Sequence, residues 1–121
     1  MKGKPVCIAT WPGLDPSLPS IVLNSHTDVV PVFPVCFSLP SLFIFYLLGK
    51  IKKDHWKHPG FSAFKDSNGN IFARGTQDMK CVTIQHIEAV GKMKSQGFRP
   101  LRTIHLTFVP DEEIGGMDGM A

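Results

Sequence analysis

The stretch from Asp78 to Pro110, DMKCVTIQHIEAVGKMKSQGFRPLRTIHLTFVP, decides the fold class. Its first half predicts a helix from about Met79 to Gln96, with Asp78 as a possible N-cap and Gly97 as the stop signal. Its second half predicts a strand from Arg102 to Pro110, with apolar residues alternating along it. The apolar positions are Cys81, Ile84, Ile87, Val90 and Met93 in the helix and Ile104, Leu106 and Phe108 in the strand.

Three earlier segments add further strands. Pro5–Trp11 and Ser20–Ser25 are continuous apolar runs, which suit strands covered on both faces. Phe61–Arg74 predicts a hairpin, because Asn68-Gly69 is a strong signal for a type I′ turn, in which both central residues have positive φ. The order strand, strand, hairpin, helix, strand predicts an α/β fold whose sheet is at least partly parallel.

Composition excludes several classes of protein. The 121 residues are 43% hydrophobic and 19% charged, which is an ordinary globular composition and argues against collagen, coiled coil and acidic disorder. The net charge of +3 comes without a basic tract, so nucleic acid is not indicated as a partner. Three cysteines without CxxC spacing favour a reducing, cytoplasmic compartment. The abrupt start and finish of the sequence suggest a piece of a larger protein.

The segment Pro34–Lys52 does not fit the pattern around it. Its uncharged part covers 16 residues and contains Pro40, whereas a membrane-spanning helix needs about 20 apolar residues, so a membrane span is not favoured. We interpret Pro34–Lys52 as an atypical hydrophobic insertion that interrupts the domain. We expect it to be dispensable, and its deletion to raise solubility.

Three polar clusters lie at the ends of predicted elements. His26 and Asp28 follow the second strand, Asp78 precedes the helix, and Glu112-Glu113 follow the last strand. Each cluster alone has an ordinary explanation: a loop histidine, an N-cap or a solvated acidic loop. Their recurrence at element ends favours a metal site, because neighbouring buried carboxylates either share a proton or bind a cation.

The motifs HTDVVP (26–31), ARGTQDMK (73–80) and TFVPDEEIGG (107–116) together resemble the zinc aminoacylase/carboxypeptidase family. The resemblance covers all of the chain except Pro34–Lys52. It implies a dinuclear zinc exopeptidase-like fold, with a mixed sheet and flanking helices in the catalytic domain and a smaller lid domain that dimerises. The 121 residues then correspond to a partial catalytic domain without the lid.

The resemblance also implies residue roles. His26 is a ligand of one zinc ion, Asp78 bridges two zinc ions and Glu113 is a ligand of the other. Glu112 is the general base, and Asp28 orients His26. The implied activity is zinc-dependent hydrolysis of N-acyl-L-amino acids to a free amino acid and a carboxylate, by an enzyme that forms homodimers through its lid.

The sequence departs from the family pattern in ways that bear on activity. Two further ligands expected downstream, an aspartate and a histidine, are not among these residues, so we expect the 121-residue chain to be inactive alone. Two alternatives stay open: a non-catalytic isoform fragment, and a translation product without function. Among the other histidines, a packed role is expected for His105, a solvent-facing one for His86, and no ligand role for His55 or His58.

Overall fold

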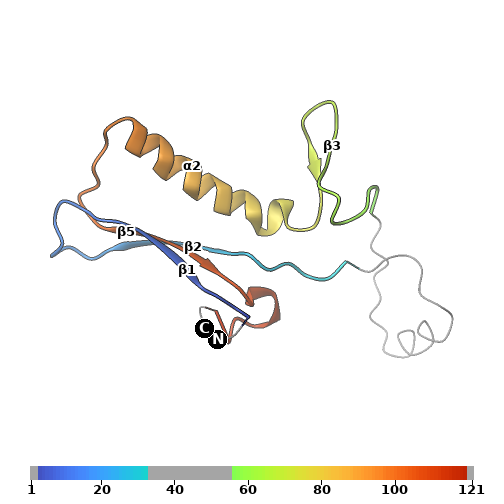
Figure 1. The fold of residues 1–121 in the computed structure, drawn as a ribbon, viewed down its shortest axis with the longest axis horizontal. Coiled ribbons are helices and arrows are strands. Elements are labelled where there is room, and N and C mark those ends of the chain that lie inside the picture. The colour runs from blue at the N-terminus through green and yellow to red at the C-terminus, as the bar shows by residue number, and fades with distance from the viewer. Residues whose placement is uncertain (1–2, 33–55, 120–121) are drawn as a thin grey trace. The chain divides into compact units, whose positions relative to one another are not determined.

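The computed structural model describes residues 3–32 and 56–119 (Figure 1). The insertion proposed at Pro34–Lys52 and the loop residue His55 lie outside the described residues. The chain divides into two compact units, one formed by Met1–Val29 with Gly75–Ala121 and the other by Val30–Arg74. None of the helices formed by the described residues is long and apolar enough to cross a membrane.

The first unit is built on a mixed sheet of three strands, as the sequence predicted (Figure 1). Strand β5 (Ile104–Val109) lies in the centre, between β1 (Cys7–Trp11) and β2 (Ile21–His26). The pairing of β2 with β5 is parallel, and that of β1 with β5 is antiparallel. Because β2 and β5 run the same way, the residues that follow them emerge at one edge of the sheet.

Helix α2 (Cys81–Ser95) packs against β2 and β5. Lys94, near its end, lies over the Trp11 ring, and Trp11 pairs with Ile104 in the sheet, so α2 covers the face that carries Ile104 and Leu106. Both of these side chains are buried. On the opposite face only the edge strands are open: Ile8 of β1 is 60% and Val22 of β2 is 53% exposed, whereas Thr107 and Val109 of β5 are buried. The expectation that the apolar runs are covered on both faces is therefore wrong for the edge strands β1 and β2.

The helix has nearly the predicted length, but the predictions that Asp78 caps it and that His86 faces solvent are wrong. Asp78 is not its N-cap: no side chain caps α2, and a kinked turn (Thr76–Lys80) precedes it, in which Asp78 has an extended backbone (φ −114°, ψ 100°). Ile84 and Ile87 are exposed, whereas Val90 is buried and His86 is half-buried rather than solvent-facing. A three-residue repeat turns back by about 60° at each step, so five such positions exceed one helix face.

The second unit contains a short hairpin, β3 (Phe64–Lys65) and β4 (Ile71–Phe72). Its turn is not of type I′, because Gly69 has a positive φ of 88° and Asn68 does not. Asp66 organises the turn instead: its carbonyl accepts the Gly69 N–H, and its carboxylate accepts the N–H groups of Asn68 and Asn70. In the same unit the His58 ring stacks on Phe64, with centroids 3.8 Å apart.

Gly75 is the glycine on which the approach to α2 depends. Its φ is +84°, and a Cβ at this position would lie 2.6 Å from Cγ1 of Val29. We therefore expect Gly75→Ala to lower the free energy of unfolding by about 2 kcal/mol, from the left-handed backbone and the close contact together. Urea denaturation measures this change.

Gly91→Ala is the matched control, because Gly91 lies inside α2 with open space around its Cβ position. Alanine there should be neutral or stabilising by up to about 1 kcal/mol. Equal effects of the two substitutions would contradict the role given to Gly75.

Candidate metal centre

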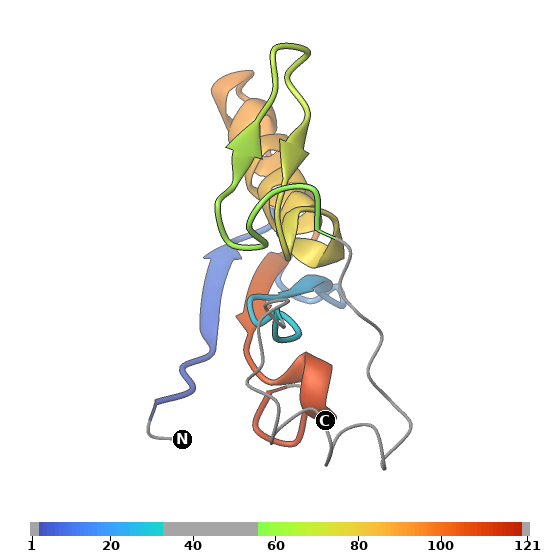
Figure 2. The ribbon, with the colours of Figure 1, turned by 90° about the vertical axis from the view of Figure 1, so that its right-hand side faces the viewer.

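Three segments from distant parts of the sequence bring the predicted site residues together. His26 is the last residue of β2 and pairs with Val109, the last residue of β5. A short 3-10 turn (Glu112–Ile114) follows β5 and carries Glu112 and Glu113. The parallel pairing thus delivers the histidine and the two glutamates to the same sheet edge, as Figure 2 shows for β5 and the turn after it.

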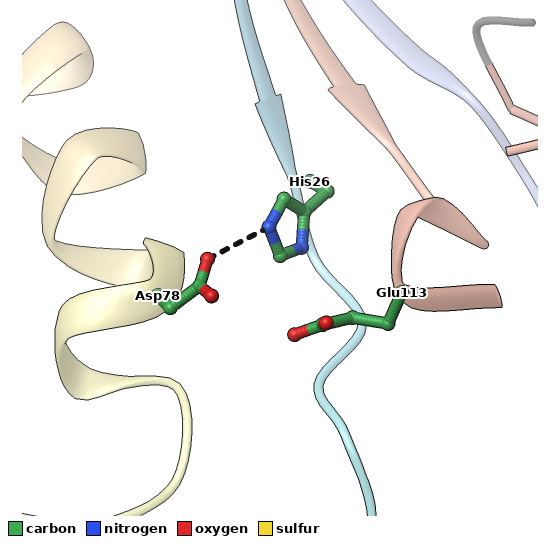
Figure 3. A group of neighbouring side chains, drawn as sticks. All are labelled: His26, Asp78 and Glu113. Atoms are coloured by element: carbon green, nitrogen blue, oxygen red, sulfur yellow. Dashed lines mark hydrogen bonds and ion pairs between the residues drawn. The ribbon is translucent and has the colours of Figure 1, made fainter. Parts of the chain in front are cut away.

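Asp78 completes the cluster from the other side, from the turn before α2 (Figure 3). One ligand atom each from His26, Asp78 and Glu113 lie within 4.8 Å of one another. Nε2 of His26 is 3.1 Å from Oδ1 of Asp78 and 3.6 Å from Oε2 of Glu112. The three side chains that the sequence singled out as candidate ligands therefore lie close together, with His26 and Asp78 in direct contact.

The His26 ring is buried and its orientation is fixed. Nδ1 is 3.0 Å from the backbone carbonyl oxygen of Asp28, which can only accept, so Nδ1 carries a proton and donates it. Nε2 then faces the carboxylates of Asp78 and Glu112. The orienting contact comes from the Asp28 backbone, because the Asp28 carboxylate is 3.5 Å from Nδ1.

The Asp28 carboxylate makes its hydrogen bonds elsewhere. Oδ1 accepts the N–H of Glu112 at 3.2 Å, and Oδ2 accepts the N–H of Glu113 at 3.1 Å. One side chain therefore caps the turn that carries both glutamates, and it ties the segment after β2 to the segment after β5. Sequence spacing could not show this contact, because it joins residues 84 and 85 positions apart.

A second tie joins the His26 segment to the Asp78 segment. Nζ of Lys80 donates to the carbonyl oxygen of Thr27 at 2.6 Å, and the Thr27 N–H donates to the carbonyl oxygen of Val109. Sequence reasoning missed Lys80, although its position two residues after Asp78, inside the ARGTQDMK motif, is a signal that it belongs to the site.

The donor set suits a zinc ion. An imidazole nitrogen with its other nitrogen hydrogen-bonded to a carbonyl, together with two carboxylates, is a common ligand combination for zinc. Burial would lower the pKa of His26. The carbonyl of Asp28, the carboxylate of Asp78 and the charges of Glu112 and Asp28 outweigh burial and raise this pKa above its ordinary value of 6.5.

The raised pKa predicts a pH dependence of stability in the metal-free chain. A protonated His26 is favoured in the folded state, so its contribution is fully present below pH 6.5 and is lost as the pH rises through the raised pKa. We expect the free energy of unfolding, measured with a chelator present, to fall from pH 6 to pH 8. In His26→Gln this fall should be smaller, and an identical fall in the two proteins would contradict the prediction.

The mixed sheet gathers an imidazole and carboxylates at one edge, which are the nitrogen and oxygen donors that a divalent metal ion binds. The sequence profile of the family described as "Peptidase family M20/M25/M40" matches residues 50–121, and the chain belongs to this metal-dependent family.

Individual relatives give the same result. The chain is 56% identical to mouse Aminoacylase-1 over 115 residues and 55% identical to human Aminoacylase-1 over 118 residues. It is 45% identical to Aminoacylase-1 of Dictyostelium discoideum over 114 residues. These alignments cover 95%, 98% and 94% of this chain, but 24%, 24% and 23% of the relatives, so the chain spans about a quarter of their length.

Proposed function

We propose that this chain is part of the catalytic domain of an aminoacylase, an enzyme that hydrolyses N-acyl-L-amino acids to a free amino acid and a carboxylate. The observation that supports this most is the convergence of His26, Asp78 and Glu113 within 4.8 Å, in a family member whose relatives are named Aminoacylase-1. The homodimer and the cytoplasmic location implied by the sequence resemblance belong to the same proposal.

In this proposal the three converging residues would hold zinc: His26 would be a ligand of one ion, Glu113 of a second ion, and Asp78 of both. When bound, zinc supplies Lewis acidity, which makes water a better nucleophile and polarises the amide carbonyl. Asp28 fixes the arrangement, through its carbonyl on His26 and its carboxylate on the backbone of Glu112 and Glu113.

Glu112 has the proton-transfer role. Its side chain is 58% exposed, so it is open to a substrate, while its carboxylate stays within 3.6 Å of His26. As general base it takes a proton from the attacking water and then gives that proton to the leaving amine, so that the C–N bond breaks as the amino acid departs. No covalent acyl-enzyme is needed, because water is the nucleophile.

Zinc binding and hydrolysis by the purified 121-residue chain test the proposal. In equilibrium dialysis we expect the wild type and His105→Ala to bind zinc, and His26→Ala not to bind it. His105 is a suitable control because its ring forms a hydrogen bond with Thr10 within the sheet. Equal zinc binding by wild type and His26→Ala would contradict the proposed metal site.

The second half of the test is the release of free amine from an N-acetyl-L-amino acid. We expect none from these residues alone, because they supply three ligands for two zinc ions. Zinc-dependent release that is lost in Glu112→Gln would support the reaction and overturn the expectation that the 121 residues are inactive.

A further inference from the structure

A lysine far from the metal cluster in sequence holds the loop on which the two glutamates stand. Nζ of Lys4 contacts Oδ1 of Asp111 and lies 2.8 Å from Oδ2 of Asp118. Because β1 pairs antiparallel with β5, with Cys7 opposite Phe108, the segment before β1 runs beside the end of β5. The sheet thus brings Lys4 to the start of the acidic loop.

Asp111 is the residue around which that loop folds. It is 6% exposed and has a positive φ of 76°. Its carbonyl oxygen accepts the N–H groups of Ile114 and Gly116, and its Oδ2 accepts the N–H of Asp118. Glu112 and Glu113 follow it directly, so any shift of Asp111 moves both glutamates.

The charge on Asp111 requires a partner. A buried carboxylate without a counter-ion is strongly disfavoured. The loop would then unfold to expose the charge to water, or the carboxylate would take up a proton and become neutral. Lys4 supplies the counter-charge, and its side chain is 37% exposed while that of Asp111 is 5% exposed. The lysine can therefore be replaced without leaving a hole in the core.

We propose that Lys4 is a positioning residue for the metal site: by pairing with Asp111 and Asp118 it fixes the loop that presents Glu112 and Glu113. The expected effect of Lys4 on zinc affinity rests on the proposed function. Its effect on the order of the loop that carries Glu112 and Glu113 does not, because that effect is present without metal. It assigns a role to the segment before β1, to which neither the sequence motifs nor the metal cluster gave one.

The direction of the effect on zinc affinity separates positioning from simple electrostatics. Removing a positive charge from the neighbourhood of a cation site would by Coulomb's law tighten zinc binding. Loosening the loop that carries Glu113 would weaken it. The proposal predicts weaker binding in Lys4→Met, by about tenfold, as for other outer contacts of metal ligands.

The first measurement is amide hydrogen exchange in the metal-free 121-residue chain, read residue by residue. In Lys4→Met we expect exchange about tenfold faster at Glu112, Glu113 and Gly116, with no change at Leu106 in β5. Lys4→Arg should restore the wild-type rates. Lys92→Met, the same change on the exposed side of α2, should have no effect.

Each outcome decides the proposal. Unchanged exchange in the loop, or equal acceleration at Leu106, would overturn it, the latter because Lys4 would then only stabilise the fold. Zinc binding that is equal or tighter in Lys4→Met would also overturn it. If wild type and Glu113→Gln bind zinc equally, the proposed metal site fails, and the exchange rates still show whether Lys4 positions the loop.

Discussion

The Glu112→Gln substitution is expected to lower the rate of N-acetyl-amino-acid hydrolysis by about 10² to 10⁴-fold, the contribution typical of a general base. Glutamine has nearly the same shape and keeps the backbone N–H that Asp28 holds, but its amide cannot accept the proton of the attacking water. The loss should therefore appear in kcat, with little change in zinc affinity or in Tm.

This measurement needs an active background, because the chain spans 24% of the mouse relative. A suitable one is a chimera in which these residues replace the matching residues of mouse Aminoacylase-1. Glu88→Gln, the same change at an exposed position of α2, is the matched control and should leave kcat unchanged. An active Glu112→Gln chimera would assign proton transfer to another group.

Asp78→Asn is expected to weaken zinc binding by at least about 100-fold. Loss of an outer contact to a metal ligand costs about 10 to 100-fold, and Asp78 is proposed as a ligand of both ions. Asparagine keeps one oxygen but loses the charge and the second oxygen donor. Competition with a chromophoric chelator measures the affinity.

The control for this substitution is Asp15→Asn. The Asp15 carboxylate bonds Ser17 in an exposed turn and should not affect zinc binding. A similar loss in both variants would mean that overall charge, rather than ligation by Asp78, sets the affinity.

The strand pattern was predictable where neighbouring residues determine it. Alternating apolar residues identified β5, and a continuous apolar run before His26 identified β2. Both patterns can be recognised within a few neighbouring residues. The exposure of Ile8 and Val22 was not predictable, since apolar side chains on an edge strand look the same in sequence whether or not anything covers them. The turn at Asn68-Gly69 was misassigned because Asp66, two residues earlier, sets its geometry.

The residues of the candidate site could be predicted from the sequence, but the contacts that hold them in place could not. His26, Asp78 and Glu113 stand at element ends in motifs of known type, and the structure brings them together. The contacts that hold them join positions about 50 to 110 residues apart: Lys80 with Thr27, Asp28 with Glu112, and Lys4 with Asp111. Such pairs depend on the register of β1 and β2 with β5, which a single sequence does not reveal.

The assignment of the site to one of the two units has a consequence for how this chain can vary. His26 and Asp78 both belong to the first unit, while residues 30–74 form the second. The distance between His26 and Asp78 is therefore set by the pairing of β2 with β5 and the packing of α2, not by the number of residues between them. Doubling a flexible connection costs only about 0.6 kcal/mol. The stretch between the two motifs can thus differ in length while His26 and Asp78 keep their spacing.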